Sequence, residues 1–315
     1  MGEFELIRTL FRPLAESTWQ DGVVLGPGDD CAIQRVPPGH ELVFSIDTLV
    51  AGVHFPAGYE PGRLGWRSLA AAVSDLAAMG ADPVCYTLAL TLPDADSDWA
   101  ESFAGGLAEA SRAFGIALAG GDITRGPLTL TLQVHGTVPA GQAIRRSGAR
   151  PGDLVAVTGP LGGAAAALGW LEAANPPASA AGFLARYHWP RPRCELGGLL
   201  RGVASAAIDI SDGLLADLGH VLVASAVGAE VEPGRVPRDF DGTLATLEQA
   251  LQGGDDYELC VTLPPAALGQ LPGHVTRTLY VIGKVCAGSG LRLLQEDGVI
   301  EEIGVPAGYD HFRGQ

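Results

Sequence analysis

Segments with the alternation of a β-strand and Ala-rich segments typical of a helix follow one another along this chain of 315 residues. In residues 41–47 (ELVFSID), Leu, Phe and Ile occupy every second position, which predicts a strand that ends in Asp47. Residues 66–80 are rich in Ala, contain no Gly or Pro before Gly80, and are predicted to form a helix. Strands and helices mixed in this way indicate α/β or α+β units.

Further segments extend this pattern and suggest where the chain divides. Strands are also expected at 85–92, 128–138, 154–158, 206–210 and 257–263, and a second helix at 98–115. Ser211 follows one of these strands and is expected to N-cap the next helix. The polar stretch 145–153 (RRSGARPGD) lies between the two halves. Because this length is typical of two domains, we expect them at residues 1–149 and 150–315.

The charge balance excludes some classes of partner. The chain has 36 acidic and 20 basic residues, a formal net charge of -16, so nucleic acids and anionic membranes would repel it. Five scattered cysteines without a CxxC pair indicate neither a disulfide framework nor a zinc site, and they fit a reducing compartment. The N-terminus has no apolar signal core and the apolar segments are too short to span a bilayer, so a cytoplasmic protein is expected.

Several acidic residues occupy unusual places for surface charges. Turns that join Gly to acids are predicted at 26–30 (GPGDD), 120–122 (GGD) and 253–256 (GGDD), while Asp47 and Asp209 each end a predicted strand. Each motif taken alone is explained by turn chemistry, because Gly supplies positive φ and Asp bonds its own backbone. Hard oxygen ligands in such positions also suit Mg²⁺, which proteins usually hold through a few carboxylates and substrate phosphates.

Asp75 is harder to explain as a solvated charge. It lies within the helix predicted at 66–80, and its neighbours one turn away are three alanines and a methionine. A charge on a buried face is costly unless it is paired or metal-bound, and no basic residue lies one turn away. This desolvation argument favours a metal ligand at Asp75 over a structural role.

Two further features leave a functional and a structural explanation open. The Gly-rich segment 159–163 (GPLGG) joins a strand to a helix and could bind an anion at the helix N-terminus. It has neither a GxGxxG pattern nor a Walker A loop, and a tight, closely packed turn is equally expected. Arg145 and Arg146 form a basic pair before the domain boundary, which taken alone is more typical of a solvated surface.

Eight motifs together resemble the thiamine-monophosphate kinase family, and they occur in the order found there. The motifs are GPGDDCA (26–32), SIDTLVAGVHF (45–55), SDLAAMGADP (74–83), GGDITRG (120–126), RRSGARPGD (145–153), VTGPLGG (157–163), DISDGL (209–214) and GGDDYEL (253–259). The wider superfamily contains aminoimidazole ribonucleotide synthetase, selenophosphate synthetase and a hydrogenase-maturation dehydratase, all of which use ATP. Each motif is weak alone, but the joint pattern is specific.

The resemblance implies a two-domain aminoimidazole ribonucleotide synthetase-like fold of α/β and α+β type. Its N-terminal domain, residues 1–149, would bind ATP and metal and would form a β-barrel across a homodimer. Its C-terminal α+β domain, residues 150–315, would cover the active cleft. The implied co-substrate is ATP, and the implied cofactor is Mg²⁺ in several copies.

By motif position the resemblance also implies roles for individual residues. The implied metal ligands are Asp30, Ser45, Asp47, Asp75, Asp122, Asp209 and Asp212, with the main chain of Ile46. The implied nucleotide contacts are Gly121, Asp122, Arg146 and Ser211. The implied contacts to the thiamine phosphate are His54, Glu258 and Tyr309, where Tyr keeps an aromatic face for the cationic thiazolium ring. The residues implied to act in catalysis are Asp122, Arg146 and Asp209.

The implied reaction transfers the γ-phosphoryl group of ATP to thiamine monophosphate, giving thiamine diphosphate and ADP. The acceptor phosphate has a second pKa of about 6, so its oxygen is already a nucleophile at neutral pH and needs no general base. Positioning and charge neutralisation would then supply most of the catalysis. Two alternatives stay open: another ATP-dependent synthetase of the superfamily, of the aminoimidazole ribonucleotide synthetase type, and a non-catalytic nucleotide- or metal-binding regulator.

Overall fold

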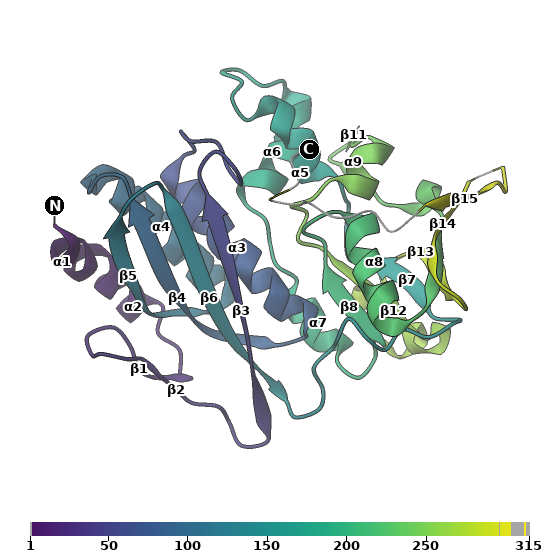
Figure 1. Ribbon diagram of the computed structural model, residues 1–315, viewed down its shortest axis with the longest axis horizontal. Helices are drawn as coiled ribbons and strands as arrows, with labels where there is room; N and C mark the ends of the chain where they lie inside the picture. The colour runs from purple at the N-terminus through teal and green to yellow at the C-terminus, as the bar shows by residue number, and fades with distance from the viewer. Residues whose placement is uncertain (1, 296, 304–311, 313–315) are drawn as a thin grey trace. The chain divides into compact units, whose positions relative to one another are not determined.

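The computed structural model describes residues 2–295, 297–303 and 312, and the chain forms two compact units (Figure 1). The first unit comprises Met1–Leu76, Ala81–Gly141 and His188–Cys194. The second unit comprises Ala77–Gly80, Gln142–Tyr187 and Glu195–Gln315. Each unit has its own β-sheet and its own hydrophobic core.

The first unit is built on a four-stranded sheet and two long helices. Its helices are α1 (Glu3–Leu6), α2 (Arg12–Ser17), most of α3 (Pro61–Ala78) and α4 (Ser97–Phe114), with a π-helical turn at Ile7–Phe11. Its strands are β1 (Val23–Leu25), β2 (Ile33–Gln34), β3 (His40–Val50), β4 (Asp82–Leu92), β5 (Ala117–Arg125) and β6 (Thr129–Pro139). The strand order is β3-β6-β4-β5; β4 and β5 are parallel and joined by α4, whereas the other two pairs are antiparallel.

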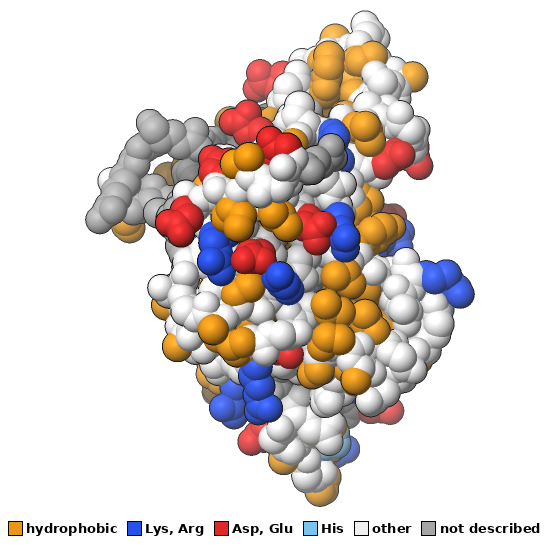
Figure 2. Space-filling model, turned by 90° about the vertical axis from the view of Figure 1, so that its right-hand side faces the viewer, with side chains coloured by type: hydrophobic (Ala, Val, Ile, Leu, Met, Phe, Trp, Pro, Cys, Tyr) orange, Lys and Arg blue, Asp and Glu red, His pale blue; other side chains and the backbone are white. Residues whose placement is uncertain are grey.

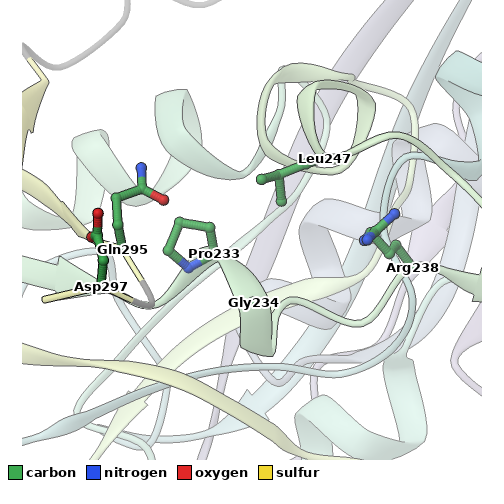
Figure 3. Close-up of a pocket in the computed structure, with 6 residues that line it drawn as sticks. All are labelled: Pro233, Gly234, Arg238, Leu247, Gln295 and Asp297. Carbon is green, nitrogen blue, oxygen red and sulfur yellow. The ribbon is translucent and has the colours of Figure 1, made fainter. Parts of the chain in front are cut away.

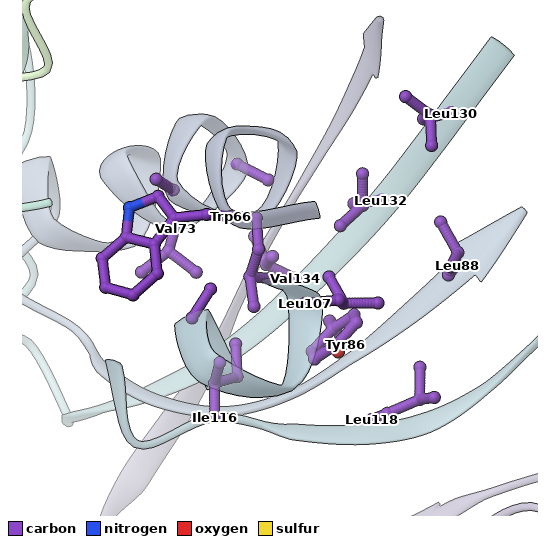
Figure 4. Close-up of a cluster of buried hydrophobic side chains, with 14 of the residues drawn as sticks. Trp66, Val73, Tyr86, Leu88, Leu107, Ile116, Leu118, Leu130, Leu132 and Val134 are labelled. Carbon is purple, nitrogen blue, oxygen red and sulfur yellow. The ribbon is translucent and has the colours of Figure 1, made fainter. Parts of the chain in front are cut away.

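The core of this unit lies between the sheet and helices α3 and α4 (Figure 4). Leu132 of β6, Val73 of α3 and Leu107 of α4 belong to the same buried cluster. The two helices approach closely at Gly106, where an added Cβ would lie 1.8 Å from the carbonyl oxygen of Gly62. A glycine that is unfavourable in an isolated helix is therefore required for the packing of α4 against α3.

The opposite face of the sheet carries exposed apolar side chains. Leu42, Phe44 and Ile46 of β3 are 42%, 62% and 61% exposed, whereas Leu49, which faces the other way, is buried. The strand predicted at 41–47 is confirmed, and its apolar residues face away from the helices. Its predicted end at Asp47 is wrong, because β3 continues to Val50 through its pairing with β6, and Asp47 lies inside the strand. Among the described residues this sheet is open, so a barrel completed by a second subunit stays a prediction.

The second unit is built on a seven-stranded sheet covered by shorter helices. Its helices are α5 (Gly163–Ala167), α6 (Ala181–His188), α7 (Cys194–Leu200), α8 (Leu214–Ser225), α9 (Leu247–Gln252) and α10 (Gly273–Thr276). The strands of its sheet are β7 (Leu154–Val157), β8 (Ala206–Asp209), β9 (Gly228–Val231), β12 (Leu259–Leu263), β13 (Tyr280–Cys286), β14 (Gly290–Leu294) and β15 (Ile300–Ile303). Their order is β15-β14-β9-β13-β7-β12-β8, in which β9 and β14 are parallel and the other pairs antiparallel. Strands β10 (Asp239–Phe240) and β11 (Thr243–Leu244) form a separate hairpin.

Two local predictions differ from the structure. The GGD motif at 120–122 was expected as a turn but lies inside β5, where Gly121 pairs with Leu88 of β4. An added Cβ at Gly121 would lie 2.1 Å from the Leu88 carbonyl oxygen, so glycine here permits close backbone approach within a strand. The helix predicted at 66–80 begins earlier, at Pro61, because Pro is well accommodated at the first position of a helix.

One face of the molecule carries charges of both signs. On the face drawn in Figure 2, acidic and basic side chains lie among one another with apolar side chains between them. Among the ion pairs of the second unit, the carboxylate of Glu230 lies 3.0 Å from Nζ of Lys284 and 3.5 Å from Nη2 of Arg292. Such surface pairs contribute little to the free energy of unfolding. No helix within the described ranges is both long enough and apolar enough to cross a lipid bilayer.

Candidate functional site

The predicted metal ligands fall into two groups, one in each unit. The first unit holds Asp30, Ser45, Ile46, Asp47, Asp75 and Asp122, and the second holds Asp209 and Asp212. Of the other predicted site residues, Gly121 and His54 lie in the first unit, and Arg146, Ser211 and Glu258 in the second. Tyr309 lies outside the described residues. Within the described part of the chain, no three His, Cys, Asp or Glu side chains gather closely enough to hold a metal ion by themselves.

Strand β3 and helix α3 bring three of the predicted ligands together. Ser45 and Asp47 alternate with the exposed residues of β3, and the Ser45 hydroxyl donates a hydrogen bond to Oδ2 of Asp75. Burial, together with the negative charge of Asp75, raises the pKa of Asp47 to about 6. Two carboxylates and a hydroxyl in this partly buried place suit a divalent cation, which would offset the repulsion between the carboxylates.

Gly121 and Asp122 lie on β5, apart from Asp47. The register through β6 and β4 aligns Asp47 with Gly121, but three strand spacings, about 14 Å, separate β3 from β5. Gly121 and Asp122 instead line a small cavity of about 70 Å³ together with Pro27 of the GPGDD motif. The other residues of its wall are Ile7, Phe11, Arg12, Leu88, Leu118, Gly120 and Ile123. The cavity therefore joins two of the Gly–acid motifs that the sequence analysis singled out.

The remaining predicted residues of the first unit lie at the surface or just after β3. Asp30 is exposed between β1 and β2, where its amide donates a hydrogen bond to Oδ1 of Asp29 at 2.9 Å. The Ile46 side chain is exposed and has no oxygen atom, so only its main-chain carbonyl could serve as a ligand. Nδ1 of His54 accepts a hydrogen bond from the Val50 amide at 3.0 Å, so the neutral ring carries its proton on Nε2.

In the second unit, the motifs DISDGL and GGDDYEL pair with each other. The amide of Asp255 donates to the carbonyl of Ser211 and that of Tyr257 to the carbonyl of Ile210, both at 2.9 Å. The amide of Ile210 in turn donates to the carbonyl of Glu258 at 2.7 Å. Asp255 and Tyr257 have φ values of 66° and 52°, a conformation that is uncommon for residues other than glycine. The pairing extends the ladder between β8 and β12 into both motifs.

Asp209 and Asp212 lie on the DISDGL segment, next to the start of helix α8. Asp209 is the last residue of β8 and is buried, whereas Asp212 is partly buried. The prediction that Ser211 caps the helix is wrong, because α8 begins after Gly213, whose φ is 116°, and no side chain caps it there. The amides of this segment are bound by Asp217 instead.

Asp217 is a residue that the sequence analysis missed. Its Oδ2 accepts hydrogen bonds from the amides of Ser211, Asp212 and Gly213 at 3.0, 3.0 and 3.1 Å. Burial raises the pKa of Asp217 to about 7, although these amides favour its ionised form. The sequence carried only a partial signal, because Asp217 lies among apolar residues of α8 but, unlike Asp75, has a basic residue, His220, one turn away.

Glu258 is fully buried in the second unit. Its carboxylate accepts hydrogen bonds from the Thr158 hydroxyl at 2.6 Å and from Nη2 of Arg186 at 2.5 Å. Gly159 allows this arrangement, because an added Cβ there would lie 2.5 Å from Oε1 of Glu258. A substrate could touch Glu258 only if a neighbouring group moved, so the structure favours an indirect influence of Glu258 on the site. The sequence analysis missed both Arg186 and Thr158.

The Gly-rich segment 159–163 is occupied by a carboxylate of the protein itself. Oδ2 of Asp256 accepts a hydrogen bond from the Gly162 amide at 2.7 Å, at the start of α5. Asp256 is buried, and burial raises its pKa to about 7. Because Asp256 already fills the place of an anion, the structure favours a packed turn over phosphate binding at this segment.

Arg146 and a large pocket complete the features of the second unit. The carbonyl of Arg146 accepts a hydrogen bond from the Ser225 hydroxyl at 3.1 Å, and the Arg146 residue is exposed.

A pocket of about 540 Å³ lies elsewhere in this unit (Figure 3). The residues that line it are Pro233, Gly234, Arg238, Leu247, Gln295 and Asp297. This pocket contains none of the predicted site residues.

Two family models and several known proteins match the chain. The models of AIR synthase related proteins match residues 28–138 for the N-terminal domain and 150–295 for the C-terminal domain. The thiamine-monophosphate kinase of Escherichia coli (strain K12) is 44% identical over 326 aligned positions, which cover 99% of this chain and 98% of that protein.

Two solved structures are similar over most of their length. The thiamine-monophosphate kinase of Stenotrophomonas maltophilia K279a is 40% identical with a TM-score of 0.82, covering 92% of this chain and 96% of its own. A structure described as AaThiL complexed with AMPPCP and TMP is 29% identical with a TM-score of 0.78, covering 99% of this chain and 97% of its own. The two-domain fold of mixed α/β content that was predicted is therefore confirmed.

Proposed function

The chain belongs to the thiamine-monophosphate kinase family within the AIR synthase related proteins, and we propose that it transfers the γ-phosphoryl group of ATP to thiamine monophosphate. The products would be thiamine diphosphate and ADP. The observation that carries this proposal is the 44% identity with the kinase of Escherichia coli over 99% of the chain. The complex of AaThiL with AMPPCP, an analogue of ATP, and TMP supports the choice of both substrates.

Mg²⁺, in several copies, is the proposed cofactor. The proposed ligands are Asp30, Ser45, Asp47, Asp75, Asp122, Asp209 and Asp212, with the main chain of Ile46. The contact between Ser45 and Asp75 beside Asp47 supports this assignment, because the group is polar, partly buried and rich in negative charge. Bound Mg²⁺ would supply positive charge to the phosphate oxygens during transfer. The hydrogen bond from Ser45 would keep the Asp75 carboxylate in a fixed orientation.

Four residues are proposed to contact the nucleotide. They are Gly121, Asp122, Arg146 and Ser211, of which Asp122 and Arg146 act in catalysis together with Asp209. Gly121 is exposed, so a phosphate could approach its backbone. The Arg146 guanidinium is always charged and planar, so it would bind phosphate oxygens in a bidentate manner. Its exposure leaves the guanidinium accessible for this role.

The acceptor side is proposed to involve His54, Glu258 and Tyr309. Nε2 of neutral His54 carries a proton, since Nδ1 is bound to the Val50 amide, and it could donate to the acceptor phosphate. A phosphate acceptor is already an anionic nucleophile at neutral pH, so no residue has to remove a proton from it. Glu258 would act on the acceptor side through the groups that it holds, because its own charge is paired with Arg186.

The organisation of the protein follows from the same proposal. We place the domain division at residue 150, with an ATP- and metal-binding dimerisation domain at 1–149 and an α+β domain at 150–315. The exposed apolar face of β3 supports a homodimer in which two first-unit sheets form the barrel. A cytoplasmic location without nucleic-acid or membrane partners fits the net charge of -16.

The proposal is tested by a chromatographic assay with ATP, Mg²⁺ and either thiamine monophosphate or free thiamine. We expect ADP and thiamine diphosphate in equal amounts from the monophosphate. Free thiamine should react very slowly, because its hydroxyl needs a base to remove a proton. Equal rates on both acceptors would contradict the proposed phosphate nucleophile.

The same assay separates the two alternatives. An ATP-dependent synthetase of the aminoimidazole ribonucleotide synthetase type would release inorganic phosphate and form no diphosphate product. A non-catalytic regulator would bind nucleotide without releasing ADP when thiamine monophosphate is present.

A further inference from the structure

Three backbone amides of the second unit converge on one oxygen atom. Oδ2 of Asp217 accepts from Ser211, Asp212 and Gly213, which are consecutive residues between β8 and α8. Asp217 itself lies in the first turn of α8 and is only 2% exposed. Its side chain therefore reaches back along the helix to the segment that precedes it.

Asp217 provides a hydrogen-bond acceptor for backbone amides at the start of α8. The first amides of a helix have no partner within it, and a buried amide without a partner is costly. No side chain caps α8 at Gly213. Asp217 instead reaches back to the amide of this N-cap residue and to the two amides before it, much as the N3 residue of a capping box reaches back to the N-cap amide. Its carboxylate also lies at the positive end of the helix dipole, which stabilises a negative charge there.

The GGDDYEL motif also contacts segment 211–213, at the carbonyl of Ser211. An added Cβ at Gly254 would lie 2.3 Å from the carbonyl oxygen of Ser211, and the Asp255 amide donates to that same carbonyl. The peptide groups of Ser211 are thus bound on one side by Asp217 and on the other by the GGDDYEL motif. Changing either partner would release only one side, so the contribution of Asp217 can be separated by experiment.

We infer that Asp217 is a positioning residue that fixes segment 211–213 and thereby orients the carboxylates of Asp209 and Asp212. The inference rests on the proposed function, in which these two carboxylates hold Mg²⁺ and Ser211 contacts the nucleotide. A buried group that orients the ligands of a metal typically changes metal affinity or activity by about 10–100-fold when it is removed. Oδ2 of Asp217 is already held by three backbone amides, so Asp217 acts on the site through the backbone.

The test compares Asp217→Ala and Asp217→Asn with the unmodified protein. We expect Asp217→Ala to accelerate hydrogen exchange of the 211–213 amides by at least about 10-fold, because their common acceptor is gone. We expect it to weaken Mg²⁺ binding, measured by calorimetry with a non-hydrolysable ATP analogue, by about 10–100-fold. Asp217→Asn keeps one accepting oxygen, so its effects should be intermediate, and it serves if the Ala variant does not fold.

Asp153→Ala is the matched control. Asp153 is also a buried acid of the second unit, and it accepts hydrogen bonds from the Arg150 amide at 2.9 Å and the Ser205 hydroxyl at 2.6 Å. Its loss should lower the melting temperature without a local change at 211–213 or a loss of Mg²⁺ affinity. The inference would be overturned if Asp217→Ala and Asp153→Ala changed the exchange of the 211–213 amides and the Mg²⁺ affinity equally. It would also be overturned if Asp217→Ala changed neither quantity.

The two proposals fail in different ways. If the unmodified protein transferred no phosphoryl group to thiamine monophosphate, the proposed function would be wrong, yet the exchange of the 211–213 amides would still report on Asp217. If transfer is normal and the exchange in Asp217→Ala is unchanged, only the positioning role is wrong.

Discussion

Nη2 of Arg186 lies 2.5 Å from Oε1 of Glu258, a side chain with no solvent exposure. Thr158 donates to the other carboxylate oxygen at 2.6 Å, so this buried charge is held by two donors from different parts of the second unit. A buried ion pair is valuable chiefly because loss of one partner leaves the other charge uncompensated.

Arg186→Ala should therefore lower the free energy of unfolding by about 3–5 kcal/mol. Arg186→Lys should recover part of this loss, because it restores the charge without the planar guanidinium. Urea denaturation measures the change. Arg235→Ala, which removes an exposed pair with Glu232, is the control and should cost less than about 1 kcal/mol. Similar losses in both Arg→Ala variants would contradict the importance of the buried pair.

Asp75→Asn should reduce turnover on the order of 100-fold while the protein stays folded. The same change removes the repulsion with Asp47, so stability without Mg²⁺ should be unchanged or higher. Kinetics at limiting Mg²⁺ and thermal melts without the metal measure both effects. Asp94→Asn, at an exposed acid of the first unit, is the control and should leave turnover unchanged. Near-normal turnover of Asp75→Asn would show that Asp75 is not a metal ligand.

The free energy of unfolding should fall between pH 6.5 and about 4 through His188. Arg63 can only donate, so Nε2 of His188 accepts from it at 3.0 Å, and Nδ1 then donates to the Tyr59 hydroxyl at 2.6 Å. Burial and the charges of Arg63 and Arg67 lower the pKa of His188 from 6.5 to about 4. The unfolded chain thus binds the proton more readily, and stability is lost as the pH falls through this range.

His188→Gln should flatten this part of the stability profile, measured by urea denaturation at a series of pH values. His40→Gln, at a histidine outside this cluster, should leave the profile unchanged. A His188→Gln protein that keeps the full slope would show that other groups cause the acid sensitivity.

Gly105 and Gly106 are adjacent in α4 and should respond to Ala in opposite directions. An added Cβ meets nothing within 4 Å at Gly105, so Gly105→Ala should raise the free energy of unfolding by about 0.5–1 kcal/mol through helix propensity. At Gly106 it would lie 1.8 Å from the Gly62 carbonyl oxygen, so Gly106→Ala should lower it by at least about 2 kcal/mol. Equal effects in denaturant melts would disprove the close approach of α3 and α4.

Phe44→Asp should convert the proposed homodimer into a monomer. Phe44 is 62% exposed on the apolar face of β3, and a carboxylate there would be buried without a partner in the dimer. Sedimentation velocity measures the change in mass. Val223→Asp, at a residue of α8 that is 72% exposed, is the control and should leave the assembly unchanged. A monomeric unmodified protein, or a dimeric Phe44→Asp protein, would count against this face as the interface.

The sequence by itself determined the local elements of this protein and the kinds of residue at its site. Alternation predicted β3, the Ala-rich run predicted most of α3, and the cost of burying a charge singled out Asp75. These predictions succeed because periodicity and desolvation act over a few neighbouring residues. The same desolvation argument does not single out Asp217, because His220 lies one turn away in α8.

Only the tertiary structure decided which of those residues meet. Arg186 and Glu258 are 72 positions apart, and Gly162 and Asp256 are 94 apart, so no local pattern connects them. Gly121 shows the same limit. In the sequence, the GGD motif resembles a turn, but glycine is required at this position because the Leu88 backbone of the neighbouring strand lies too close for a side chain. Contacts between distant segments depend on how whole elements pack, and that packing is a property of the complete fold.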